Sequence, residues 1–402
     1  MHNVRPMLAA LGAAAVLAGC RGGSSPSVSA LPNVRLVQQL QAGHKVGLGA
    51  VLNTKDGGQV FGFDVDQTGN DGALASGLTI KNNGATRVSV ETFDQNSGAI
   101  TSSFANETGT VNSYGFDGIF FGDIGLVTHY YVPKGQIFAQ RFYEVMNPVT
   151  AQKFTGKWTP PIKDIDVLQA GVNQTTSESV LFAIELKNND NPDLVVTNIA
   201  ANTVSKTIHL DPNLFGGADG PQLAQYTTAN EAVIALSPDG GTVGGQAPLN
   251  VVVNLQTGKT TQFSGYNNGG FHAGFVNGAA VDPNTGVEVT TTELNSQVEF
   301  YDVKHARGIT FVQLPCTTNT DQTTSGAGIV NDPIHKLFLV MEPQNGCGPG
   351  GAVQVYDEAG HLVETITGFG LALSEPPAAL IPSKRMGWAF GPQFNQLQQF
   401  FY

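Results

Sequence analysis

One repeated phrase constrains the fold of this chain more than any other feature. The phrase is an apolar strand, a polar turn that usually carries Asp or Asn, and a second strand. Copies lie at residues 88–94, 194–198, 251–255, 298–303 and 353–357, with a weaker copy at 142–147. After residue 45 no long segment keeps the 3.6-residue apolar period of a helix. The pattern therefore predicts an all-β chain of short strands.

The spacing of the repeat, about 40–55 residues with four strands in each unit, predicts a single β-propeller. The clearest unit has strands at 279–283, 287–292, 298–303 and 309–314. Counting such units predicts seven blades, with six or eight as alternatives, near residues 59–104, 113–156, 163–210, 229–264, 274–314, 324–367 and 375–402. The last unit lacks an outer strand. We expect residues 34–41 to supply it, because closing the ring removes two exposed strand edges.

The unit at 278–314 resembles the YVTN-type propeller repeat, in which a VDPxTG segment precedes an Asn-bearing loop and a VxVxD strand. Residues 281–286 read VDPNTG, but residues 292–295 read TELN where that family usually has YVTN. Residues 237–240 read SPDG, which is similar to a turn found in propellers of several families. These resemblances imply the architecture and identify no activity.

The N-terminal segment indicates export. Arg5 precedes an apolar run at residues 7–17, which is too short to span a bilayer and is typical of a secretory signal. Residues 17–20 read LAGC, which resembles the lipobox of bacterial lipoproteins. The resemblance implies a signal peptide at 1–19 and lipidation of Cys20. The alternative is an ordinary secretory signal with an incidental cysteine.

Residues 20–33 are small and polar and are predicted to be a flexible tether, with the propeller at 34–402. Arg21 follows the lipidated cysteine where the inner-membrane retention signal of that family has Asp. The protein is therefore expected at the cell envelope, anchored to the outer membrane and facing the periplasm or the cell surface. In that oxidising compartment, the remaining pair Cys316 and Cys347 is expected to form a disulfide. The bridge would contribute roughly 3 kcal/mol by the chain-entropy estimate.

The net charge of the chain is −12, and only 13% of its residues are charged. Binding to nucleic acid depends on clustered Lys and Arg, so the acidic balance argues against a nucleic-acid partner.

The candidate site is the mouth of the central channel, formed by the loop after the second strand of each blade and the loop that enters each first strand. Glu185, Glu293 and Glu342 follow the second strands of the third, fifth and sixth blades. Gln246 holds this position in the fourth blade, and His272 lies in the loop that enters the fifth. Converging carboxylates could bind Ca²⁺ or a cationic small molecule. Alternatively, they lie on a solvated rim. No other cofactor is expected.

The sequence contains no GxSxG, P-loop or dinucleotide-binding pattern, and its histidines show no paired metal-ligand spacing. The first hypothesis is therefore a non-catalytic lipoprotein whose propeller face binds a partner protein, peptide, glycan or small molecule at the envelope. The alternative is a metal-dependent hydrolase of the lactonase type. In that case the three glutamates would hold one divalent ion, and a carboxylate or His272 would act as the base.

Overall fold

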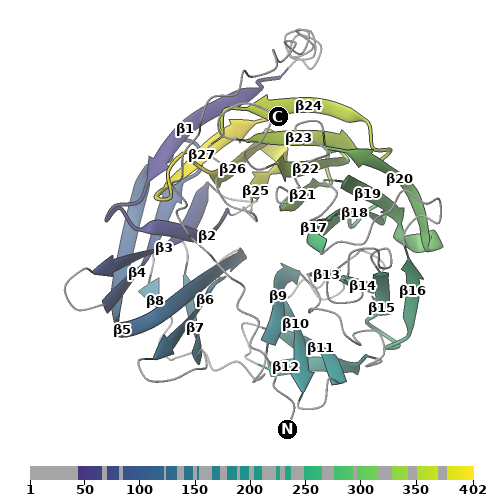
Figure 1. Cartoon of the computed structure of the whole chain (residues 1–402), viewed down its shortest axis with the longest axis horizontal. Helices are drawn as coiled ribbons and strands as arrows, with labels where there is room; N and C mark the ends of the chain where they lie inside the picture. The colour runs from purple at the N-terminus through teal and green to yellow at the C-terminus, as the bar shows by residue number, and fades with distance from the viewer. Residues whose placement is uncertain are drawn as a thin grey trace, which may run out of the picture.

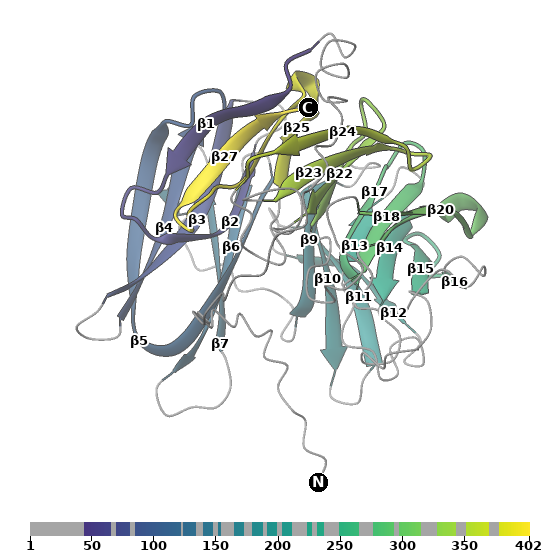
Figure 2. The ribbon, with the colours of Figure 1, turned by 45° about the horizontal axis from the view of Figure 1, so that its top comes forward.

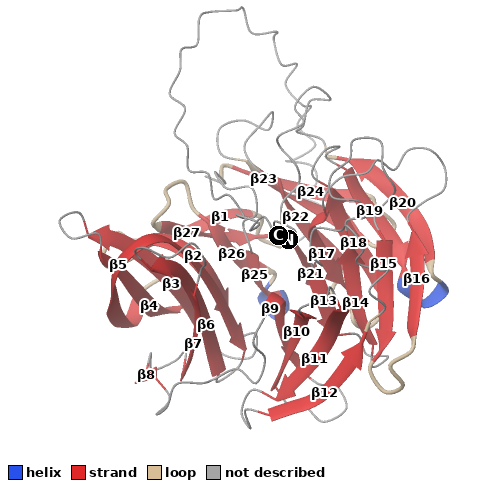
Figure 3. Ribbon diagram, turned by 60° about the horizontal axis from the view of Figure 1, so that its bottom comes forward, coloured by secondary structure: helices blue, strands red, loops and turns tan. Residues whose placement is uncertain are grey.

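The computed structural model describes residues 44–65, 70–80, 85–121, 124–133, 140–147, 152–153, 165–172, 179–187, 191–198, 203–210, 223–226, 231–236, 249–264, 276–292, 297–314, 328–342, 351–369 and 378–402. Strands make up nearly all of these residues (Figure 3). Two short 3₁₀ turns, η2 Val303–His305 and η3 Pro382–Lys384, are the helical elements of the described chain. Within it, no helix has the length and apolarity needed to cross a bilayer.

The described strands form seven antiparallel blades around a central axis (Figure 1). Blades 1 and 2 share one seven-stranded sheet. They contain β2 Gln59–Val65, β3 Asp71–Ile80, β4 Ala85–Asp94, β5 Ile100–Phe121, β6 Ile124–Pro133, β7 Gln140–Asn147 and β8 Gln152–Lys153. The long strand β5 joins the two blades, because its first half pairs with β4 and its second half pairs with β6.

Blades 3 to 7 are separate four-stranded sheets. Blade 3 contains β9 Ile165–Val172, β10 Ser179–Lys187, β11 Asn191–Asn198 and β12 Thr203–His209, and blade 4 contains β13 Leu223–Tyr226, β14 Glu231–Leu236, β15 Leu249–Asn254 and β16 Thr260–Ser264. Blade 5 contains β17 Val276–Val281, β18 Val287–Thr292, β19 Gln297–Asp302 and β20 Arg307–Gln313. Blade 6 contains β21 Ile329–Asp332, β22 Leu337–Glu342, β23 Ala352–Asp357 and β24 Leu362–Thr367, and blade 7 contains β25 Ala378–Ile381, β26 Met386–Phe390, β27 Gln396–Phe401 and β1 Gly47–Asn53.

The first strands of the blades close a complete circle. Each contacts the first strand of the next blade, from β2 through the second half of β5 to β9, β13, β17, β21 and β25, and β25 returns to β2. The prediction of one seven-bladed propeller is therefore confirmed. The predicted blade limits are also close to those observed, except that blade 4 begins at Leu223 rather than at residue 229.

The repeated phrase is the third strand of the blade. Its six copies coincide with β4, β7, β11, β15, β19 and β23. The polar residue at the end of this strand fixes the turn that follows. In blade 1, Asp94 Oδ1 accepts hydrogen bonds from the backbone N–H groups of Asn96 and Ser97, at 3.1 and 2.8 Å. Gly98 then adopts a φ of 72°, in the left-handed region that favours glycine.

Three further turns have the same geometry without a glycine. Ala306, Lys336 and Arg385 have φ values of 50°, 57° and 46°. Each follows a short turn between antiparallel strands. A sequence search for glycine at this position does not find these turns.

The ring is closed by an N-terminal strand, as predicted, but residues 34–41 are not that strand. Its place on the outside of blade 7 is taken by β1, whose Gly47 and Asn53 lie opposite Phe401 and Gln396 of β27. Figure 2 shows β1 beside β27. The prediction followed from the need to complete the last blade, which does not define the strand; the strand that pairs here also forms a bulge between Leu48 and Val51.

Side-chain amides hold that bulge in place. The Gln398 Nε2 group donates to the carbonyl oxygens of Gly49 and Ala50, at 3.2 and 3.1 Å. The Ala50 N–H donates to Gln399 Oε1 at 3.1 Å, and Gln399 Nε2 donates to the Gln95 carbonyl of blade 1 at 2.9 Å. A Cβ on Gly49 would lie 2.3 Å from Gln399 Oε1, so this position has no room for a side chain. The two glutamines therefore replace the backbone pairing that the bulge interrupts.

Apolar side chains fill the spaces between blades rather than one central core. Trp388 of blade 7 packs edge-on against Phe93 of blade 1, with ring centroids 5.2 Å apart. The Trp388 indole N–H donates to the Gln95 carbonyl at 3.1 Å. Both faces of a blade are consequently buried against its neighbours, apart from the outer strand.

The Gln399→Ala substitution is expected to lower the free energy of unfolding by about 2–3 kcal/mol, because it removes hydrogen bonds to Ala50, Gln95 and Asn96 and leaves the Ala50 N–H in the bulge without this partner. Chemical denaturation measures the loss. Gln393→Ala, at an exposed position in the same blade, is the matched control and should change stability by less than about 0.5 kcal/mol. Equal stability of the two variants would contradict the proposed closure.

Candidate functional site

The propeller presents two edges that differ in construction. The turn edge carries the connections from first to second and from third to fourth strands, described at residues 94–99, 254–259, 282–286, 302–306, 332–336, 357–361 and 381–385. The mouth edge carries the remaining connections, described at residues 54–58 and 391–395. This edge holds the loops in which the candidate site was predicted.

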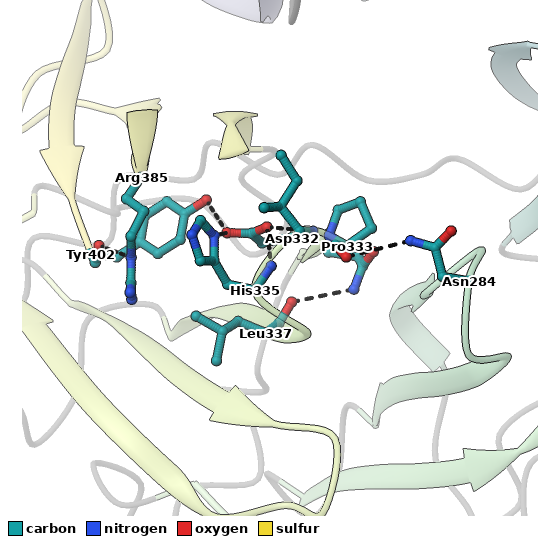
Figure 4. A network of polar contacts seen from close by, with 9 residues as sticks. Asn284, Asp332, Pro333, His335, Leu337, Arg385 and Tyr402 are labelled. Atoms are coloured by element: carbon teal, nitrogen blue, oxygen red, sulfur yellow. Dashed lines mark hydrogen bonds and ion pairs between the residues drawn. The ribbon is translucent and has the colours of Figure 1, made fainter. Parts of the chain in front are cut away.

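On the turn edge, Asp332 is the centre of a buried polar network (Figure 4). Its Oδ1 accepts from the backbone N–H groups of Ile334 and His335, at 2.9 and 3.0 Å. Its Oδ2 accepts from His335 Nδ1 at 2.7 Å and from the Tyr402 hydroxyl at 2.9 Å. Burial and the nearby Asp332 charge raise the pKa of Tyr402 well above its usual range, so the hydroxyl stays protonated. Arg385 Nε donates to the Tyr402 carbonyl at 2.8 Å within blade 7, and the bond from the Tyr402 hydroxyl to Asp332 ties blade 7 to blade 6.

Similar hydrogen bonds cross other blade junctions on the turn edge. Asn284 Nδ2 of blade 5 donates to the Pro333 carbonyl of blade 6 at 3.4 Å. Lys384 Nζ of blade 7 donates to the Asn70 and Asn96 side chains of blade 1, at 3.0 and 3.2 Å. The aspartates and histidines of these turns thus stabilise the turns and the contacts between blades.

On the mouth edge, the link from β1 to β2 is clamped onto blade 1. The Lys55 N–H donates to both carboxylate oxygens of Glu91, at 3.0 and 3.1 Å. Ser89 Oγ donates to Asp56 Oδ2 at 2.8 Å, and Asp56 Oδ1 accepts from the Gly58 N–H at 2.9 Å. Burial raises the pKa of Glu91, and the bond from Lys55 acts in the opposite direction.

The neighbouring loop at 391–395 is also fixed through its backbone, yet it exposes a large apolar ring. Its Phe394 carbonyl accepts from the Val60 N–H of blade 1 at 2.8 Å, and its Asn395 carbonyl accepts from the Thr54 N–H at 2.9 Å. The Phe394 residue is nevertheless 56% exposed. The backbone of this loop is therefore held in place by hydrogen bonds, while the Phe394 side chain remains exposed.

The predicted mouth residues are only partly described. Glu342 is the last residue of β22 and is fully buried, and its Oε2 accepts a hydrogen bond from Gln354 Nε2 at 2.7 Å. Glu185 lies in β10 opposite Asp193, two residues before the strand ends. Gln246, Glu293 and His272 lie outside the described residues, so their convergence stays a prediction. Cys20, Cys316 and Cys347 also lie outside them.

The structure adds a pair of buried carboxyl groups that sequence reasoning missed. Glu288 of β18 and Glu299 of β19 are buried on the face of blade 5 that packs against blade 4. Desolvation raises the pKa of each to about 8, and the charge of Glu299 adds to the effect on Glu288. The Tyr301 hydroxyl donates to Glu299 Oε2. Both glutamates alternate with apolar neighbours, a pattern that normally indicates a solvent-facing side of a sheet, but here both sides are covered.

In the described part of the chain, no group of three or more His, Cys, Asp or Glu side chains is arranged to hold a metal ion. The described site residues are thus a rigid aromatic loop at the mouth edge, the Asp332 network at the turn edge and a carboxyl pair between blades.

Comparisons with known proteins establish the fold and nothing finer. No protein-family model matches the chain, and no curated protein sequence matches it. Among solved structures it is similar to U3-55K, with a TM-score of 0.58, 11% identity, and coverage of 89% of this chain and 100% of that one. It is similar to the WD40 repeats of RRP9, with a TM-score of 0.58, 12% identity, and coverage of 89% and 99%. It is also similar to Sqt1 from Chaetomium thermophilum, with a TM-score of 0.54, 10% identity, and coverage of 89% and 99%. The chain is a β-propeller of the same general architecture.

In chelator-treated buffer, the free energy of unfolding is expected to fall as the pH rises from about 5 to about 9. Glu288 and Glu299 keep their protons in the folded protein up to a pKa of about 8, whereas in the unfolded chain they lose them near the ordinary glutamate pKa of 4.5. The folded state binds more protons between these values, so stability is lost as the pH rises through them. The loss is on the order of a few kcal/mol.

Thermal unfolding of wild type and of Glu299→Gln across this pH range tests the expectation. The variant should show a flatter pH profile, because its amide cannot ionise. Glu231→Gln, which removes a half-buried carboxyl from blade 4, should leave the wild-type slope in place. A wild-type profile that rises towards pH 9 would contradict the burial of neutral carboxyls.

Proposed function

We propose that this protein is a lipid-anchored binding protein of the bacterial envelope, whose propeller holds a partner protein, peptide, glycan or small molecule at its mouth edge. The single observation that carries the binding role is the rigid loop at 391–395 with its exposed Phe394 ring. Fold alone does not define function, so the proposal rests on this site.

Phe394 has the properties of an interaction anchor. An exposed aromatic ring on a fixed backbone can bury a large apolar area on binding and loses little conformational entropy. Lys55 is exposed in the adjacent link and directs its Nζ to Ser103 Oγ of blade 1 at 3.3 Å, so the binding argument rests on the aromatic ring. An exposed aromatic ring suits a protein, a peptide or the apolar face of a sugar. Of these, we favour a protein or peptide partner, because aromatic residues dominate the energetics of such interfaces.

The alternative, a metal-dependent hydrolase of the lactonase type, gains no support from the described site. It requires Glu342 to share an ion with Glu185 and Glu293. The Glu342 carboxylate is buried within blade 6 and already accepts a hydrogen bond from Gln354. Binding without catalysis therefore remains the function that the geometry supports best.

The envelope location is proposed from the lipobox-like segment that ends at Cys20 and from the polar tether that follows it. The proposal includes the YVTN-type repeat, the anchor in the outer membrane and the disulfide between Cys316 and Cys347. The last residue described before Cys316 is Leu314, at the end of blade 5, and the last before Cys347 is Glu342, at the end of the second strand of blade 6. Cys316 and Cys347 themselves lie outside the described residues, so their pairing is proposed from the sequence alone.

Phe394→Ala is expected to reduce recovery of the partner from crosslinked envelope preparations by about tenfold, the effect of losing one interface anchor. Ile334→Ala is the matched control, because Ile334 is also an exposed apolar residue, at 61%, but lies on the turn edge. Partner recovery is quantified by mass spectrometry, with thermal unfolding to confirm that both variants fold. Equal recovery with the two variants would remove Phe394 from the binding site.

Cys20→Ser is expected to move the protein from the membrane fraction to the soluble fraction, because the lipid supplies the anchor. Metabolic labelling with a fatty-acid analogue should mark the wild type and leave the variant unlabelled. Continued membrane association of an unlabelled variant would show that another part of the chain provides the attachment.

A further inference from the structure

The space between blades 4 and 5 contains a buried group of oxygen-bearing side chains. From blade 5 come Glu288 and Thr290 of β18 and Glu299 of β19, which are at most 1% exposed. Thr290 lies opposite Glu299 in the sheet, so the two side chains point from the same face. From blade 4 comes Asn250 of β15, also fully buried, whose side-chain amide lies 3.3 Å from both carboxylate oxygens of Glu288.

Two oxygens in this space have no hydrogen-bond partner among the described residues. They are Glu299 Oε1 and the side-chain carbonyl of Gln297, a residue that is only 8% exposed. The Thr290 hydroxyl is directed at the Glu299 carboxylate, and its hydrogen bond lowers the pKa of Glu299. Gln297 begins β19 at the mouth edge, on the same side of the strand as Glu299. Buried polar atoms without partners in a native protein call for a water, an ion or a functional role.

The chemistry of the group favours a cation. The described side chains around it offer carboxylate, hydroxyl and amide oxygens, including the Tyr301 hydroxyl that donates to Glu299, and none of the groups that shift the pKa of Glu288 or Glu299 is a cation. When both carboxyl groups are ionised they carry a charge of −2, which is costly in a dry interior unless it is neutralised. A divalent ion cancels that charge. Asn250 is compatible with either state, because its amide nitrogen can donate to Glu288 when no ion is bound and its oxygen can face the ion when one is.

We infer that blades 4 and 5 hold a Ca²⁺ site, formed by the Glu288 and Glu299 carboxylates with oxygens from Thr290, Gln297 and Asn250. Ca²⁺ accepts six to eight oxygen ligands at irregular positions, whereas Mg²⁺ requires nearly ideal octahedral geometry and retains its waters. Ligands from two separate blades and three kinds of side chain suit the larger and more tolerant ion. The bound ion would join the blades on the side of the ring opposite the β1–β27 closure.

The test uses the full protein after removal of metal by chelation and dialysis, at pH 8. Equilibrium dialysis with radioactive Ca²⁺ is expected to show one bound ion per chain. Millimolar CaCl₂ should raise the midpoint of thermal unfolding by several degrees in a saturable manner, because the ion binds only the folded state. MgCl₂ at equal ionic strength should have a much smaller effect.

Glu288→Gln and Glu299→Gln should each abolish the Ca²⁺-dependent shift and the stoichiometric binding, while Glu231→Gln on blade 4 should retain both. If a glutamine variant does not fold, the wild-type dialysis and the Ca²⁺-against-Mg²⁺ comparison still decide the question. Two results would overturn the inference. One is a wild-type protein that binds no Ca²⁺ at pH 8, with a stability that depends on pH alone. The other is binding that persists in both glutamine variants.

Discussion

The closed ring of this molecule depends on the pairing of β1 with β27, which joins two segments almost a whole chain apart. The Ala50 N–H and the Gln399 side chain that accepts its hydrogen bond are 349 residues apart. Closing such a loop is costly in chain entropy, although the cost grows only slowly with length. The pairing repays it by removing two strand edges and by bringing Trp388 of blade 7 onto Phe93 of blade 1. Without the β1–β27 pairing, the seven blades would stack in an open row with both end strands exposed.

A closed ring buries both faces of each blade, and this changes the meaning of polar residues in its strands. In an open sheet, a glutamate that alternates with valines would face water. In this ring Glu288, Glu299 and Glu342 are buried, and each carboxyl group has a different hydrogen-bond partner. Glu342 accepts a hydrogen bond from Gln354, and Tyr301 donates to Glu299. The buried carboxyl groups between blades 4 and 5 couple stability to pH and, in our proposal, to Ca²⁺, whereas the junction between blades 7 and 1 is held by apolar contacts and amide hydrogen bonds.

The polar groups on the two edges of the ring have different roles, which agrees with the proposed binding function of the mouth edge. On the turn edge, the carboxylates of Asp94 and Asp332 accept hydrogen bonds from backbone N–H groups. These bonds shape the turns and occupy the carboxylate oxygens. On the mouth edge, the loop with Phe394 is anchored through carbonyl oxygens, so its side chain is available to a partner. A rigid scaffold with functional side chains on its connecting loops is the usual arrangement for a binding protein.

The sequence by itself determined the repeat, and with it the all-β class, the number of blades and the third strand of six of them, because strand alternation and Asx turns are local properties. It also predicted that an N-terminal strand closes the ring. Only the tertiary structure decided which strand that is, since the bulge in β1 needs Gln398 and Gln399 from the far end of the chain. It likewise decided that Glu342 is buried, that Phe394 is exposed and that Glu288 meets Asn250. The burial of a side chain in this ring depends on contacts between blades. A local sequence pattern does not indicate which residues of one blade face the next blade.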